Sequence, residues 1–299
     1  MPRLAAVDVG SNTVHVLVAD TTDGRLVDVA HYVEMPGLGS AVARMGRIGS
    51  AKSDEAIAAL ESVMTRAAQH GFEHLVAGAT AAVREAADSR DFLERAEAAL
   101  GVPMRLISEE AEAQLSFLGV ASRQATRRDW LMVDLGGGST EVVAGRGGHL
   151  TRWVSLRLGS GVLGSELSDP PRGPEIDDLK GKARLELERT PDCRPVRLVA
   201  TGGTASNLHR LLGTRERKEL SAAELERCRQ RLAASPAEEV ARRHQLSEQR
   251  VLALRGGVEI LLLLLERYHL DRLRVTHEGL RHGMILAYRR RGEDWYLPS

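Results

Sequence analysis

Hydrophobic and polar positions along the chain follow two alternating periods. Short apolar runs rich in β-branched residues, typical of buried strands, are separated by longer segments with helical spacing. In the first part of the chain this pattern predicts strands at residues 4–9, 13–19, 26–32, 74–78 and 104–107, and helices at 53–69, 88–100 and 109–122. Asp23 and Gly24 predict a hairpin turn, and the glycine-rich stretch 36–50 predicts a loop.

The alternation resumes after a polar segment at residues 123–129. Strands are predicted at 130–135, 140–144, 153–158, 196–200 and 273–276, and helices at 176–189, 222–232, 248–269 and 280–290. This order of strands and helices predicts the α/β class. We place a domain boundary in the polar segment, which gives domains of residues 1–124 and 125–299, with the final helix able to pack back on the first domain.

Two similar segments open the two predicted domains. VDVGSNT at residues 7–13 and VDLGGGST at 133–140 both read as a strand, an aspartate, a glycine-rich turn and a returning strand. A turn of this kind can present several backbone N–H groups to an anion, because glycine leaves the backbone uncovered. For one such turn taken alone, an ordinary tight hairpin is the better explanation. The repetition favours two similar domains facing each other across a cleft.

A third glycine-rich segment, ATGGTASN at residues 200–207, follows a predicted strand and precedes a predicted helix. Its amides and the helix N-terminus would point at an anion together. Three candidate phosphate-binding turns on one chain favour a phosphate ligand. Asp8 and Asp134, at strand ends, would favour a hard cation such as Mg²⁺, unless each aspartate only caps its own turn.

Two further segments carry candidate chemistry. The acidic run Ser108–Glu112 opens a helix, where a serine cap and acidic residues are ordinary, but one carboxylate could also serve as a general base. Arg84 follows a strand and could form a surface salt bridge or hold a phosphate.

Composition narrows the class of function. Lys+Arg and Asp+Glu are both 41, so the net charge of zero argues against binding to nucleic acid or a membrane through bulk positive charge. Two cysteines give neither a disulfide framework nor a zinc-site spacing, and no apolar run is long enough to span a bilayer. The N-terminus has no signal-peptide pattern, so we expect a cytoplasmic protein.

Taken together, these segments resemble the exopolyphosphatase / guanosine pentaphosphate phosphatase family. The runs that carry the resemblance occur in order: AAVDVGSNTVHVLVAD from residue 5, GATAAVREA from 78, LISEEAEAQLSFLGV from 106, VDLGGGSTEVV from 133, ATGGTASNL from 200 and EGLRHGMIL from 278. The resemblance implies an actin-like (ribonuclease H-like) two-domain fold with an active site in the interdomain cleft. It also implies a Mg²⁺-dependent phosphohydrolase that removes the terminal phosphate of inorganic polyphosphate or of guanosine pentaphosphate, and it suggests a homodimer.

The resemblance also assigns residue roles. Glu112 would be the base that activates water, Arg84 would neutralise phosphoryl charge, and Asp134 and Glu141 would position Mg²⁺, with Asp8 assisting from the other domain. The implied phosphate-binding residues are Gly10, Ser11, Asn12, Gly136, Gly137, Gly138, Ser139, Gly202, Gly203 and Thr204.

Several positions depart from the family pattern. Glu109, Ala111 and Gln114 stand where the family usually has Gly, Glu and Arg, and Leu252 stands where an Asp is expected. The chain resembles short members without extra C-terminal helical domains, so we expect shorter substrates or less processive action. Two alternatives stay open: a kinase or ATPase of actin-like fold, and a catalytically weak sensor that binds polyphosphate or a guanosine alarmone.

Overall fold

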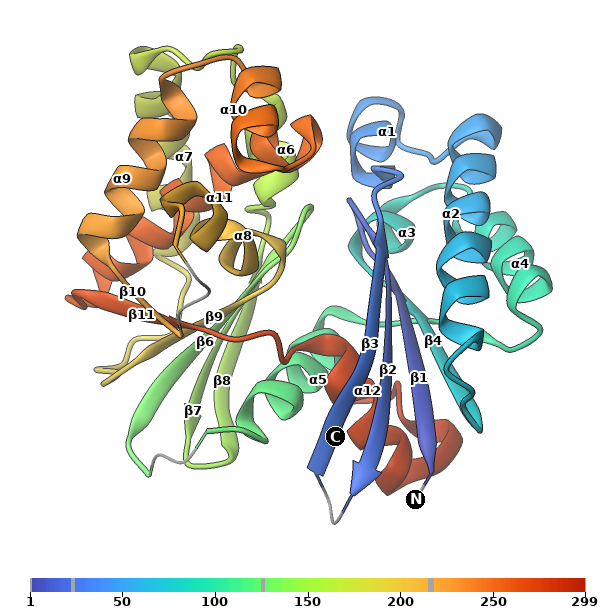
Figure 1. Cartoon of the computed structure of the whole chain (residues 1–299). Helices are drawn as coiled ribbons and strands as arrows, with labels where there is room; N and C mark the ends of the chain where they lie inside the picture. The colour runs from blue at the N-terminus through green and yellow to red at the C-terminus, as the bar shows by residue number, and fades with distance from the viewer. Residues whose placement is uncertain (1, 23–24, 125–126, 215–217, 299) are drawn as a thin grey trace. The chain divides into compact units, whose positions relative to one another are not determined.

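The chain divides into two compact units, Met1–Arg123 with Glu278–Ser299, and Gln124–His277. The structure is a computed structural model, and it describes residues 2–22, 25–124, 127–214 and 218–298. The sequence-based division assigned residues 278–299 to the second domain, whereas the structure assigns them to the first unit. The reason is that helix α12 (Leu280–Arg291) packs on α5 (Glu109–Ala121) and on β1 (Arg3–Val9), as Figure 1 shows.

The first unit contains a five-stranded sheet in the order β3-β2-β1-β4-β5. Strands β1, β2 (Val14–Thr22) and β3 (Arg25–Glu34) are antiparallel neighbours, while β4 (His74–Ala79) and β5 (Met104–Leu106) run parallel to β1 and β4, respectively. All five strands were predicted from the apolar runs. The predicted turn at Asp23 and Gly24 lies outside the described residues.

Strand β1 is buried on both faces of this sheet. Ala5, Val7 and Val9 belong to the core under helices α2 (Ser50–Ala68) and α4 (Ser89–Leu100). Leu4 and Ala6 belong to a second core with α5 and α12. Because successive side chains of a strand point to opposite faces, Asp8 lies on the α5 and α12 side. The apolar run thus reflects helices on both faces of the sheet.

Two short helices complete the first unit. The predicted loop at residues 36–50 was wrong, since α1 (Leu38–Met45) forms there between Gly37 and Gly46, both with φ of 68°. The glycines that indicated a loop are the left-handed residues that bound this helix. Helix α3 (Ala81–Glu85) follows β4 directly and includes Arg84.

The second unit contains a six-stranded sheet in the order β10-β11-β9-β6-β7-β8. Strands β6 (Asp129–Leu135), β7 (Thr140–Arg146) and β8 (His149–Leu156) are antiparallel, and β9 (Leu198–Thr201) is parallel to β6. Strand β11 (Arg272–Val275) is parallel to β9, and the short β10 (Glu219–Ser221) pairs with β11. Both units therefore place an antiparallel three-stranded meander beside parallel strands, which confirms the predicted α/β class with an actin-like sheet in each half.

Six helices among the described residues pack in the second unit: α6 (Ser160–Ser165), α7 (Gly173–Leu187), α8 (Gly203–Leu212), α9 (Ala222–Ala233), α10 (Ala237–His244) and α11 (Glu248–Arg267). Helix α11 is buried along most of its length and packs on α6, α7, α9 and α10. The sequence pattern missed α6, α10 and β10, which are short. None of the helices in the described part of the chain is long and apolar enough to cross a membrane.

Candidate functional site

The turn between β1 and β2 is the first of the three predicted phosphate-binding segments. The N–H of Gly10 donates to the carbonyl of Thr13 at 2.9 Å and closes the hairpin. The carbonyls of Ser11 and Asn12 accept from Gly39 and Gly37 at 2.7 and 3.2 Å. The start of α1 therefore holds the turn, and the amide of Gly10 is already used within it.

Glu112 and Arg84 are in direct contact in the first unit. Nη1 of Arg84 donates to Oε2 of Glu112 at 3.0 Å and to the carbonyl of Ile107 at 2.7 Å. Both side chains are mostly buried, with 18% and 10% of their surfaces exposed. The structure thus brings together the predicted base and the predicted phosphate-binding guanidinium.

The start of α5 determines which glutamate faces Arg84. Ser108 caps the helix, because its side chain accepts from the amide of Ala111 at 3.2 Å. Glu110 is exposed and accepts from Gln114, whereas Glu112 is buried. Ala111 is also buried, so the small residue at this departure from the family pattern lies in the core, and the local geometry favours Glu112 over Glu110.

Asp8 has a partner that the sequence did not predict. Arg281, at the start of α12, places Nη1 3.5 Å from Asp8 Oδ2, and both side chains are largely buried. The segment that includes Arg281 was part of the family resemblance, but no role was assigned to it. Asp8 is therefore an ion-pair partner in this structure, and its part in cation binding stays a prediction.

Asp134 and Glu141 lie directly opposite each other on β6 and β7. Residues paired in this way have Cβ atoms about 5 Å apart on one face of the sheet. Glu141 is only 2% exposed, and Ser155 on β8 donates to its Oε1 at 2.9 Å. Because the Gly136–Ser139 turn joins β6 to β7, this pairing places both carboxylates beside the turn. Ser155 was missed because its proximity depends on the register of β8.

The Gly136–Ser139 turn is held by α6. The amide of Gly136 donates to the carbonyl of Ser139 at 3.0 Å. The carbonyl of Gly136 accepts from the amide and from the hydroxyl of Ser160, each at 2.9 Å. A Cβ on Gly159 would lie 2.2 Å from the carbonyl oxygen of Gly137, so the two segments are in backbone contact. Helix α6 fixes this turn and leaves the amides of Gly137 and Gly138 as its candidate donors.

The Gly202–Gly203 turn lies beside Asp134. Gly202 has a φ of 93°, and a Cβ there would lie 2.5 Å from the carbonyl oxygen of Leu135 and 3.3 Å from Asp134 Oδ1. Only glycine both adopts this positive φ readily and leaves room for the carbonyl oxygen of Leu135. The Thr204 hydroxyl has no hydrogen-bond partner among the described residues, and it lies against Gly257 of α11. Its role as a phosphate ligand stays a prediction.

Arg250, in the first turn of α11, is a residue that sequence reasoning missed. Its guanidinium covers Gly203, since a Cβ built there would lie 2.1 Å from Nη1. Burial lowers the pKa of Arg250, and the positive charge of Arg210 lowers it further. Within the described part of the chain, no carboxylate forms an ion pair with this guanidinium. No local motif indicates Arg250, because its proximity to Gly203 arises only in the folded unit.

The residues present fit Mg²⁺ held mainly through water and substrate. In the described ranges, no group of three or more His, Cys, Asp or Glu side chains is arranged to hold a metal by itself. Mg²⁺ commonly uses one or two carboxylates, several waters and phosphate oxygens. Asp134 and Glu141, opposed across β6 and β7, provide such a pair of carboxylates.

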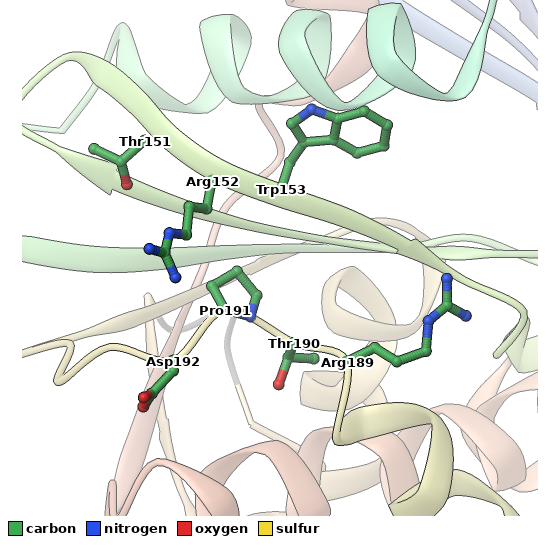
Figure 2. Close-up of a pocket in the computed structure, with 7 residues that line it drawn as sticks. All are labelled: Thr151, Arg152, Trp153, Arg189, Thr190, Pro191 and Asp192. Atoms are coloured by element: carbon green, nitrogen blue, oxygen red, sulfur yellow. The ribbon is translucent and has the colours of Figure 1, made fainter.

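A separate recess of about 570 Å³ lies in the second unit, between β8 and the segment that follows α7. Figure 2 shows Arg152 directed towards Pro191 and Asp192, and Trp153 directed to the other side of the strand. The recess contains none of the predicted site residues.

Comparison with known proteins identifies the family of the chain. The model of the Ppx/GppA phosphatase family matches residues 17–291. Exopolyphosphatase 1 of Mycobacterium bovis is 33% identical over 231 residues, which are 71% of this chain and 64% of that protein. The chain thus spans less than two thirds of the length of this curated relative.

Solved structures share the fold over nearly the whole chain. The Ppx/GppA family member of Aquifex aeolicus is 27% identical, with a TM-score of 0.81 and coverage of 98% of this chain and 99% of that one. An exopolyphosphatase of Cytophaga hutchinsonii, 23% identical, has a TM-score of 0.87 over 95% and 96% of the two chains. With the family model matching most of its length, the chain belongs to the Ppx/GppA phosphatase family.

Proposed function

We propose that the protein is a Mg²⁺-dependent phosphohydrolase that releases terminal orthophosphate from inorganic polyphosphate. The observation that carries this proposal is the buried contact, 3.0 Å long, between Arg84 of α3 and Glu112 in the first turn of α5. It joins a carboxylate suited to general-base chemistry with a guanidinium suited to phosphate. The exopolyphosphatase name of the 33% identical relative supports polyphosphate as the substrate class.

In the first unit, Glu112 would accept a proton from the attacking water. The water oxygen forms a bond to the terminal phosphorus as the bridging P–O bond breaks, and the electron pair leaves with the shortened polyphosphate. Arg84 would bind the terminal phosphoryl oxygens and release part of its contact with Glu112 as it does so. A base held by a guanidinium is pre-oriented, which is most of what phosphoryl transfer requires of a protein.

In the second unit, the groups suited to phosphate are the Gly136–Ser139 turn, the Gly202–Gly203 turn and Arg250. We assign Arg250 to phosphate binding because it combines a guanidinium with partial burial and no carboxylate partner among the described residues. Asp134 and Glu141 would hold Mg²⁺, which when bound neutralises charge on the phosphate oxygens. Ser155 would keep the Glu141 carboxylate in one orientation.

A panel of substrates tests the proposal. Phosphate release from inorganic polyphosphate, guanosine pentaphosphate and ATP is measured on the purified chain with and without Mg²⁺. We expect Mg²⁺-dependent release from polyphosphate. Release from guanosine pentaphosphate alone would shift the assignment to the nucleotide, and turnover of ATP alone would favour the kinase or ATPase alternative. Binding of polyphosphate without turnover would favour the sensor.

A further inference from the structure

Two arginines of the second unit lie beside the two ends of helix α8. Arg250 lies over Gly203, the first residue of α8, and Arg210 lies near the other end of the same helix. Arg210 Nη1 donates to the carbonyl of Gln245 at 2.8 Å, just before the cap of α11 at Ser247. This bond ties Arg210 to the short connection that leads into α11, the helix that includes Arg250.

Among the residues that the structure describes, no carboxylate balances the charges of these two arginines. Neither Arg210 nor Arg250 forms an ion pair within the ranges that the structure describes, whereas the nearby Arg243 is paired with Glu239 at 2.6 Å. Arg210 is exposed and Arg250 is half-buried, so an anion from solvent can reach both. Burial and, after it, the positive charge of Arg210 lower the pKa of Arg250, so the two guanidinium groups repel each other and an anion that contacts both would relieve this repulsion.

Spacing indicates the shape of that ligand. From Gly203 to Arg210 helix α8 rises by ~10 Å at 1.5 Å per residue. A single phosphate at the glycine turn is too small to reach Arg210 as well. A linear chain of phosphates with charge on every unit can contact the turn and both guanidinium groups in succession.

We propose that Arg210, together with Arg250, forms a distal subsite for the inner phosphates of an extended inorganic polyphosphate. This subsite rests on the proposed function, because it extends the same phosphate site away from the Gly202–Gly203 turn. Arg210 is the residue that distinguishes a long linear polyanion from a short one, since Arg250 already contacts the turn.

The test compares chain lengths in an Arg210→Gln variant. Binding of tripolyphosphate and of long-chain polyphosphate is measured by calorimetry in a Glu112→Gln background, which removes the proposed base, and kcat/KM is measured for both in the otherwise wild-type chain. We expect affinity for the long chain to fall about tenfold, the effect of one lost charge-assisted contact, and affinity for tripolyphosphate to stay unchanged. Arg210→Lys should recover part of the loss.

A matched control and the contrary outcomes decide the proposal. Arg290→Gln removes the same charge from an exposed position in the last turn of α12 and should change neither affinity. Equal losses for both lengths, no loss for either, or a loss confined to guanosine pentaphosphate would overturn the distal subsite. If the wild-type chain binds long polyphosphate through Arg210 but hydrolyses none, the subsite stands and the proposed function fails.

Discussion

Replacing Gly203 with alanine separates substrate binding from folding. A Cβ at this position would lie 2.1 Å from Nη1 and 2.9 Å from Cζ of Arg250. Carbon and nitrogen atoms without a bond between them need more than 3 Å, so the guanidinium must move by about 1 Å or more. Because a guanidinium is the end of a flexible side chain, the backbone can stay where it is.

The two expected effects differ in size. Alanine is preferred over glycine in a helix by up to about 1 kcal/mol, so the free energy of unfolding should change by less than about 1 kcal/mol in either direction. Displacing Arg250 removes a hydrogen bond from a charged donor to phosphate, worth roughly 1.5–3 kcal/mol, or about 10- to 100-fold in affinity. Gly203→Ala should therefore retain its melting temperature and lose affinity.

The assay measures urea unfolding and the KM for polyphosphate on the same preparations. Gly181→Ala in α7 is the matched control, because nothing lies within 4 Å of a Cβ there. It should gain up to about 1 kcal/mol of stability and leave KM unchanged. A Gly203→Ala variant with normal KM would refute the assignment of Arg250 to phosphate binding, as would a rise in KM that merely follows a loss of stability.

Two further predictions concern stability in the first unit. Gly119→Ala should destabilise the protein by about 1–3 kcal/mol in urea unfolding, because its Cβ would lie 2.2 Å from the backbone oxygen of Gly279, which cannot move as a side chain can. Burial alone would raise the pKa of Asp28, but hydrogen bonds from His282 and His31 outweigh it and hold that pKa well below its usual range. The stability advantage of wild type over Asp28→Asn should therefore shrink as the pH falls from about 4 towards 2, measured by unfolding across this pH range; an unchanged difference would contradict it.

Local sequence pattern predicted the strands well for a physical reason. Strand β1 is apolar on both faces because helices pack on each side, and β6 is buried along most of its length, so each strand is visible as a short apolar run. Helix α1 could not be predicted in the same way. Its flanking glycines resemble a loop, and it forms because its first amides bind the carbonyls of the Gly10–Thr13 turn.

Contacts between distant segments explain what the sequence left out. The predicted roles of Arg84 and Glu112 rested on resemblance, and their contact joins residues 28 positions apart. Arg250 and Arg281 each approach a site residue only after helices α11 and α12 pack. Arg250 does not differ in its local sequence from an ordinary charged residue on a helix surface, and the segment of Arg281 indicates the family but not the contact with Asp8, so only tertiary packing reveals these two contacts.

The most direct test of the proposed chemistry is phosphate release from polyphosphate by wild type and by Glu112→Gln, with Mg²⁺ present. A lost general base should lower kcat by about 10²- to 10⁴-fold with little change in KM. Glu110→Gln, an exposed neighbour in the same helical turn, should retain full activity. Wild-type turnover by Glu112→Gln, or an equal loss in Glu110→Gln, would contradict the assignment of Glu112 as the base.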